Sequence, residues 1–246
     1  MLTKAQNKYI RALSQQKNRN EHGTYVVEGE KLAEEWLASD CKIQMVVALT
    51  EWIKMHTDLL AKHPEAEVIH AEQHHLESIT GLQTANQVIL VAYADKTPEP
   101  IVAGEWCIAL DTLQDPGNMG TIIRIADWFG IRHVVASPGS VDFYNPKVVQ
   151  SAMGGHLRVS LHKEELDTMF GKIKSPVYAA TLGGENIYQL KEKTPGFILI
   201  GNESKGISDE LLSKATKRIT IPGKGGAESL NAAVSAGIIC ALLTEG

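Results

Sequence analysis

The chain has 246 residues, of which 43% are hydrophobic and 22% are charged, and its formal net charge at pH 7 is −5. These proportions are those of a folded globular protein and argue against a disordered or fibrous class, and the length allows one large α/β domain or two smaller ones. The negative charge argues against a protein that coats nucleic acid over its whole surface, because such binding requires many cationic side chains. Any contact with nucleic acid must therefore be local.

The start of the chain is a local exception, because it carries basic side chains and no acidic one. Lys4, Lys8 and Arg11 recur at helical spacing, while Ile10 and Leu13 provide an apolar side. The pattern predicts an amphipathic helix with a cationic face. Two interpretations of that face remain open, namely binding of RNA phosphates and ordinary solvation of a helix surface.

The cysteines and the longest apolar run bear on location. Cys41, Cys107 and Cys240 are widely separated and odd in number, which favours reduced thiols over a disulfide framework. The apolar run over 232–243 is interrupted and too short to cross a bilayer, and the amino terminus lacks the apolar core of a secretory signal. We therefore expect a cytoplasmic protein with no membrane partner.

From Thr24 onward, apolar runs typical of strands alternate with helical patterns. In chain order they are the strand TYVVEG, a helix over 31–38, the strand KIQMVVAL, a helix over 51–62, the strand EVIH, a helix through 76–79 and the strand QVILVAY. This order predicts a small α/β domain over residues 1–95. The polar, proline-interrupted stretch that follows predicts a linker over residues 96–104.

Beyond the linker, the short apolar runs are WCIALD, HVVASP, VYAATL and FILIGN, and helical patterns separate them. This alternation is typical of a mostly parallel sheet covered by helices. Residues 105–246 are therefore predicted to form a second α/β domain.

Three turns in the second domain combine glycine with asparagine, and each lies between an apolar run and a helical pattern. They are LQDPGNMGTIIRIADWFG, LIGNESKGIS and ITIPGKGGAESLNAAVSAGIICALL. Open α/β sheets bind ligands at the carboxyl ends of their strands, so these turns are the candidate site. Taken singly, each residue has an ordinary explanation: Asn118, Ser229 and Asn231 as helix caps, Arg124 as a surface cation and Glu203 as a turn residue.

Taken together, the three turns resemble the three motifs of the SpoU (TrmH) family of RNA ribose methyltransferases in order, spacing and local context. The matching residues, motif by motif, are Asn118, Gly120 and Arg124; Gly201, Asn202, Glu203 and Gly206; and Ile221, Pro222, Glu228, Ser229, Leu230 and Asn231. More weakly, TYVVEGEKLAEEWL and the basic start of the chain resemble the family's N-terminal RNA-substrate-binding domain. The resemblance therefore covers nearly the whole chain.

The resemblance implies an S-adenosylmethionine-dependent enzyme that methylates a ribose 2′-hydroxyl of RNA. It also implies that the C-terminal domain is an α/β trefoil knot, a topology otherwise nearly absent from proteins, and that two chains form a homodimer through these domains. The cofactor would be held largely by backbone groups. The positions that match its pocket are Gly201, Ile221 and Leu230, together with Thr181, Leu182 and Gly183 in the loop that completes it.

The resemblance assigns Arg124 to the target oxygen and makes Asn118, Glu203, Ser229 and Asn231 the residues that position the reacting groups. Methyl transfer requires the hydroxyl in line with the sulfonium methyl and the removal of its proton. A guanidinium stays protonated in proteins, so we interpret Arg124 as an orienting and charge-stabilising group rather than a base.

The alternative from another class is a non-catalytic RNA-binding protein with the same fold, and the joint presence of the motif residues argues against it. No metal site is expected, because His70, His74 and His75 lack a cysteine partner or an H-E-x-x-H pattern. Ribosomal and transfer RNA both remain open as substrates, and the two-domain layout favours ribosomal RNA by analogy.

Overall fold

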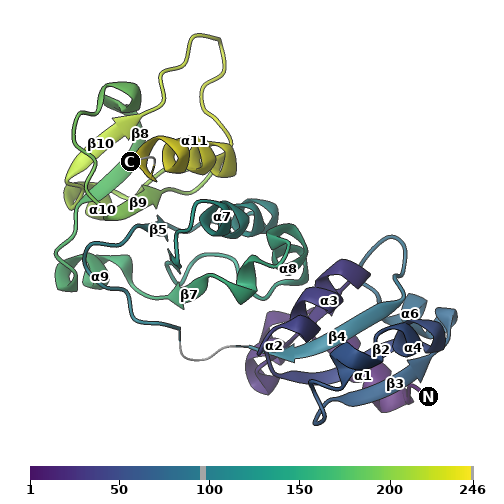
Figure 1. Ribbon diagram of the computed structural model, residues 1–246. Coiled ribbons are helices and arrows are strands. Elements are labelled where there is room, and N and C mark those ends of the chain that lie inside the picture. Colours follow the sequence, from purple (N-terminus) through teal and green to yellow (C-terminus); the bar gives the residue numbers. More distant parts are fainter. Residues whose placement is uncertain (95–97, 245–246) are drawn as a thin grey trace. The chain divides into compact units, whose positions relative to one another are not determined.

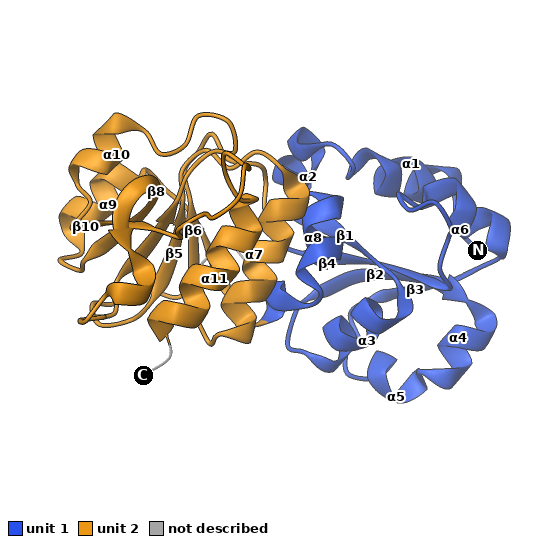
Figure 2. Ribbon diagram, turned by 90° about the horizontal axis from the view of Figure 1, so that it is seen from above, with its two compact units in different colours: residues 1–96, 144–157 blue, residues 97–143, 158–246 orange. Residues whose placement is uncertain are grey.

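The computed structural model describes residues 1–94 and 98–244 (Figure 1). They form two compact units, coloured separately in Figure 2: unit 1 contains residues 1–94 and 144–157, and unit 2 contains residues 98–143 and 158–244. The predicted end of the first domain at residue 95 and the first two residues of the predicted linker, 96 and 97, lie outside the described residues.

Unit 1 is built on a four-stranded sheet in the order β1-β4-β2-β3. The strands are β1 (Thr24–Glu28), β2 (Ile43–Leu49), β3 (Glu67–Ala71) and β4 (Val88–Tyr93). Strand β4 is antiparallel to β1 and β2, whereas β2 and β3 are parallel. Each strand lies where an apolar run predicts one.

Helices cover both faces of this sheet. They are α1 (Lys4–Ala12), α2 (Gln16–His22), α3 (Glu30–Ala38), α4 (Thr50–Met55), α5 (Thr57–Leu60) and α6 (Gln73–Ile79). One apolar core contains residues of α3 and α4, the other contains residues of α1 and α6, and the neighbours Val26 and Val27 belong to different cores. The helix expected over 51–62 is divided into α4 and α5 at His56, whose ring stacks on Trp52 and hydrogen-bonds to its carbonyl oxygen at 2.8 Å. That bond competes with helix continuation.

A segment from the second half of the chain completes unit 1. It contains α8 (Pro146–Ala152) and the 3-10 turn η1 (Gly155–Leu157). Val149 of α8 is fully buried in the same core as Trp36, and the ring of Tyr144 lies 4.5 Å from that of Tyr25. The predicted division into residues 1–95 and 105–246 places this segment in the second domain. It packs in unit 1 because α8 has an apolar face that this core buries.

Unit 2 is built on a six-stranded sheet in the order β10-β8-β9-β5-β6-β7, and its paired strands are parallel. Its strands are β5 (Cys107–Leu110), β6 (His133–Ala136), β7 (Ser160–Lys163), β8 (Val177–Asn186), β9 (Phe197–Ile200) and β10 (Lys217–Thr220). Its helices are α7 (Pro116–Trp128), α9 (Leu166–Lys172), α10 (Asp209–Ser213) and α11 (Ala232–Thr244), with a 3-10 turn η2 (Ile187–Gln189). The C-terminal helix α11 packs against α7 and β9 (Figure 1).

The carboxyl ends of β6, β5 and β9 lie side by side in this sheet. Leu110 at the end of β5 pairs with Ala136 of β6 on one side and with Ile200 of β9 on the other. The loops that follow these strands therefore start from one edge of the sheet, where parallel sheets bind ligands. None of the described helices is long and apolar enough to cross a membrane.

Candidate active site

Asn118 joins the three motif segments. It is buried, its Nδ2 donates to Oε1 of Glu203 at 3.0 Å, and its Oδ1 accepts from Nδ2 of Asn231 at 2.8 Å. Residues from three distant parts of the sequence are thus linked by hydrogen bonds. The resemblance predicts that these three residues position the reacting groups.

Local capping explains why these side chains are available. Asp115, not Asn118, is the N-cap of α7, and its Oδ1 accepts from the backbone N–H of Asn118 at 2.7 Å. The side-chain amide of Asn118 is therefore released from capping and can bind Glu203. Asn231 does cap α11, because its Oδ1 accepts from the N–H groups of Ala233 and Val234, while its Nδ2 still reaches Asn118.

Glu203 is the acceptor at the centre of these contacts. Besides Asn118, the backbone N–H groups of Gln114 and Asp115 donate to its carboxylate at 3.3 and 3.1 Å. Burial by itself would raise the pKa of Glu203, but the hydrogen bonds from Asn118 and from the backbone of Glu203, Asp115 and Gln114 outweigh it, so the pKa lies below its usual value. A carboxylate occupied in this way holds loops together better than it accepts a proton.

The turn that carries Glu203 requires its glycine. A side chain on Gly201 would lie 2.3 Å from the backbone of Gly206, and Asn202 and Gly206 exchange backbone hydrogen bonds across the turn. The Asn202 Oδ1 accepts from the N–H groups of Ser204 and Lys205, and its Nδ2 donates to the carbonyl of Thr112. The turn is therefore closed internally and tied to the loop after β5.

Arg124 and Ser229 are not part of the hydrogen-bonded cluster. Arg124 lies on the exposed face of α7, and within residues 1–94 and 98–244 it has no hydrogen bond or ion pair. Ser229 lies in the exposed loop before α11, likewise without a hydrogen bond to a described residue. The guanidinium of Arg124 is consequently available to an anionic ligand.

The predicted cofactor positions combine polar and apolar features that suit a ligand. Thr181 Oγ1 is enclosed without a hydrogen-bond partner in the described structure, while Leu182 and Leu230 leave 78% and 49% of their surface exposed. Ile221 is half-buried. An enclosed hydroxyl and exposed apolar side chains suit a ligand with polar and apolar parts. A side chain at Gly183 would meet no other atom within 4 Å. At Gly184 a side chain would lie 2.5 Å from the backbone of Arg218, so that position requires glycine.

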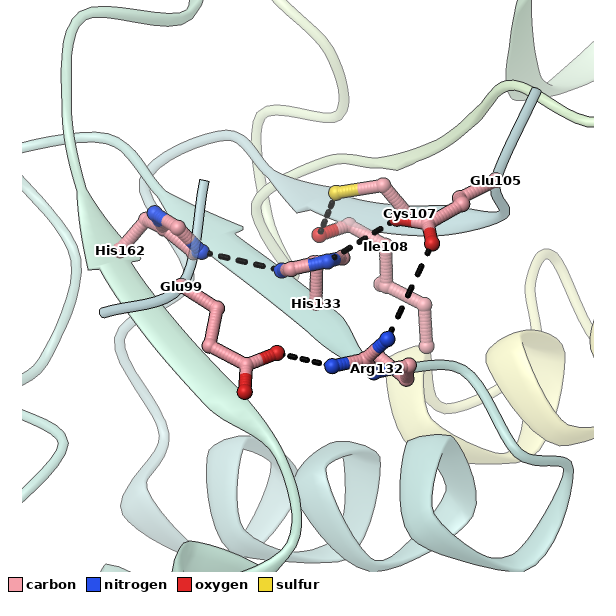
Figure 3. A network of polar contacts seen from close by, with 7 residues as sticks. All are labelled: Glu99, Glu105, Cys107, Ile108, Arg132, His133 and His162. Carbon is pink, nitrogen blue, oxygen red and sulfur yellow. Dashed lines mark hydrogen bonds and ion pairs between the residues drawn. The ribbon is translucent and has the colours of Figure 1, made fainter. Parts of the chain in front are cut away.

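A second polar network lies at the other edge of the sheet (Figure 3). His133 at the start of β6 is fully buried, with Nδ1 at 3.2 Å from Nε2 of His162 and Nε2 at 3.2 Å from Glu105, while Arg132 pairs with Glu99. Burial lowers the pKa of His162 and the neighbouring His133 lowers it further, against the opposite effect of Glu164. Glu105 precedes β5 and Asn118 follows it, so this network and the motif residues lie at opposite ends of that strand. Among the described residues no group of three potential ligands could hold a metal ion.

The basic residues of the first helix belong to unit 1. Lys4, Lys8 and Arg11 are exposed on α1, which begins with a capping box between Thr3 and Gln6. Arg19 from the same stretch is buried, and its Nη1 donates to the carbonyls of Leu13 and Ser14. The cationic face of α1 is therefore formed as the pattern predicts, whereas Arg19 has a structural role.

The comparisons with known proteins agree with the resemblance seen in the sequence. The SpoU rRNA methylase family profile matches residues 105–241, and the profile of the MRM3-like substrate-binding domain matches residues 4–90. The 23S rRNA guanosine 2′-O-methyltransferase RlmP of Bacillus subtilis is 31% identical over 231 residues, which cover 92% of this chain and 91% of the relative.

Two solved structures resemble the whole chain. A protein of the TrmH family from Porphyromonas gingivalis has 35% identity and a TM-score of 0.85, with 99% of this chain and 98% of that chain covered. The S-adenosylmethionine-bound rRNA methyltransferase of Sinorhizobium meliloti has 27% identity and a TM-score of 0.88, with 99% and 95% covered. The expected fold class, an α/β chain with a substrate-binding domain followed by a methyltransferase domain, is thereby confirmed.

Proposed function

The chain belongs to the SpoU rRNA methylase family, and from that premise we propose that it methylates a ribose 2′-oxygen of ribosomal RNA of the large subunit. The protein is an RNA ribose methyltransferase, and its cofactor is S-adenosylmethionine. The observation that carries the proposal is the hydrogen bonding of Asn118 on α7 to Glu203 and Asn231, together with the exposed Arg124 on the same helix, which has no hydrogen bond or ion pair with a described residue. A non-catalytic RNA-binding protein would have no need to keep this arrangement.

The residues of the chain suggest a division of tasks. Arg124 binds the phosphate or ribose oxygen of the target nucleotide and stabilises charge there, because a protonated guanidinium cannot act as a base. The Glu203–Asn118–Asn231 cluster fixes α7 relative to the loops after β9 and before α11. Thr181, Leu182, Gly201, Ile221 and Leu230 would hold the cofactor, whose sulfonium supplies the electrophilic methyl group. Ser229 lies in the loop before α11, and by resemblance to the family it helps to position the reacting groups.

Unit 1 is the candidate for RNA recognition. Lys4, Lys8 and Arg11 form a cationic face on α1, within the range that matches the MRM3-like substrate-binding domain. Relatives named as acting on 23S rRNA support ribosomal over transfer RNA. Phosphate contacts of this kind position an RNA without reading its sequence.

We further propose a cytoplasmic homodimer formed through unit 2. Trp128 on α7 is 82% exposed and Val234 on α11 is 50% exposed, and these two helices pack against each other. Exposed aromatic and aliphatic side chains on one helix pair favour a protein interface. The resemblance also implies a trefoil knot in this unit, in which Gly184 of β8 approaches the backbone of the paired strand β10 too closely for a side chain. The three free thiols favour a reducing compartment.

The test combines cofactor binding with methyl transfer. Purified protein is titrated with S-adenosylmethionine by calorimetry and is then incubated with labelled cofactor and ribosomal RNA or transfer RNA from a strain that lacks the gene. We expect cofactor binding and label in 23S rRNA, at a 2′-O-methyl site that is missing from the deletion strain. Label in transfer RNA alone would overturn the substrate. RNA binding without cofactor binding or label would overturn the enzymatic function.

A further inference from the structure

Thr112 has an unusual backbone conformation at the candidate site. It follows Asp111 at the end of β5, and its φ of 52° lies in the left-handed region. This region is unfavourable for residues other than glycine and most of all for β-branched ones such as threonine. Such a conformation persists only where the surroundings impose it, and it occurs preferentially at functional sites.

Side chains from the two neighbouring loops impose this conformation. Ser137, in the loop after β6, accepts the N–H of Thr112 at 2.8 Å, and Asn202, in the loop after β9, donates to its carbonyl at 2.8 Å. Ser140 accepts the N–H of Leu113 at 3.1 Å. Ser137 and Ser140 are 8% and 6% exposed, so little water competes for these bonds.

Thr112 and Leu113 are followed directly by the residues that bind Glu203. The next two N–H groups along the chain, those of Gln114 and Asp115, donate to Glu203, and Asp115 then caps α7. The direction in which the chain leaves Thr112 therefore sets where these amides point. It also sets where α7 begins, and α7 carries Asn118 and Arg124.

We propose that Ser137 and Ser140 are positioning residues for methyl transfer, which together with Asn202 hold Thr112 in its left-handed conformation and so align the start of α7 with Glu203. The proposal rests on the methyltransferase function proposed above. Neither serine belongs to a motif of the sequence. A merely structural role, in which each hydroxyl satisfies a buried N–H group, predicts a loss of stability alone.

The experiment is a double-mutant cycle in the full-length protein with S-adenosylmethionine and ribosomal RNA. Ser137→Ala should lower kcat roughly tenfold or more with little change in KM for the cofactor, since small misplacements of reacting groups have large effects on rate. Glycine adopts the left-handed region without strain and needs less support there. In the Thr112→Gly background, the loss caused by Ser137→Ala should therefore be at least about threefold smaller. Ser140→Ala should lower kcat in the same way.

Controls separate the possible failures. Ser137→Thr retains a hydroxyl and should retain most of the activity, and Ser213→Ala, which removes an exposed hydroxyl bonded to the Glu210 carbonyl, should change nothing. Unchanged kcat in Ser137→Ala, or equal losses in both backgrounds, would overturn the proposal. The same double-mutant cycle can also be measured as changes in thermal stability, which requires no enzymatic activity. If the wild-type protein fails to methylate RNA, the function is wrong, and coupling between residues 112 and 137 still decides whether the support exists.

Discussion

Each of the two units has an apolar core, but they differ in what fixes the segments around the sheet. Unit 1 is a sheet between two apolar cores, one of which is completed by Val149 from a segment far along the chain. At the carboxyl edge of the sheet in unit 2, loops are fixed by bonds from side chains such as Glu203 and Asn202 to backbone groups. Burial of apolar area tolerates small displacements, whereas hydrogen bonds are directional. Unit 2 can therefore hold reacting groups in a fixed geometry.

The largest effect is expected at Arg124, whose side chain should contribute to turnover but not to the stability of unit 2. Arg124→Ala and Arg124→Lys should each lower turnover by roughly 100-fold or more, because lysine keeps the charge but loses the planar fork. Calorimetry should show almost normal S-adenosylmethionine binding, and the melting temperature should not change. Arg132→Lys, at the opposite edge of the same sheet, is the matched control. Wild-type rates in both Arg124 variants would make it a plain surface residue.

The next effect tests the part of unit 1 that comes from the second half of the chain. Val149→Ala should lower the free energy of unfolding by about 2 kcal/mol, since it removes buried methyl groups and leaves a cavity. Urea denaturation followed by circular dichroism measures this loss. Lys147→Ala on the exposed face of the same helix should change it by less than about 0.5 kcal/mol. Equal effects of the two substitutions would mean that α8 is not part of the core.

The same packing affects truncation. A chain that lacks residues 1–95 would expose the apolar face of α8, so we expect it to bind a hydrophobic dye and to aggregate. Replacing residues 144–157 by a short polar loop in that truncated chain should restore solubility. If the truncated chain is already soluble and binds no dye, α8 does not depend on unit 1.

A smaller, pH-dependent effect should mark Glu203. Because its pKa in the folded protein is lowered, the ionised carboxylate stabilises the fold above its unfolded pKa, and this contribution is lost as the pH falls through the lowered value. The difference in melting temperature between wild type and Glu203→Gln should thus be full at neutral pH and should vanish in acid. Turnover should fall roughly tenfold. The exposed Glu192→Gln is the control, and a pH-independent difference would contradict the mechanism.

The smallest effects per residue are expected on α1. The slope of log affinity for RNA against log salt should fall by about 0.7–0.9 when Lys4, Lys8 or Arg11 is replaced singly by Ala, because each variant binds one phosphate fewer. Cofactor affinity should stay the same. Lys54→Ala, which removes an exposed cation paired with Glu51 in the same unit, should leave the slope unchanged. If the α1 variants behave like this control, their charges only solvate the helix.

The sequence by itself determined the fold class, the strands of unit 1 and the motif residues. Strand runs such as KIQMVVAL and the amphipathic spacing of α1 are local patterns, and local patterns are visible without a structure. The resemblance identified Asn118, Glu203 and Asn231 because the motifs keep fixed spacing. It also identified Arg124, which the structure leaves exposed and outside their cluster.

Only the tertiary structure decided which residues meet. Asp115 rather than Asn118 caps α7, Gly184 lies against the backbone of the paired strand β10, and α8 packs in unit 1. Ser137 supports Thr112 because β6 and β5 are neighbours in the sheet. A serine in a loop has no local pattern that marks such a partner, since its role depends on strand order. Strand order is set by long-range pairing and burial across the whole domain rather than by the residues around it.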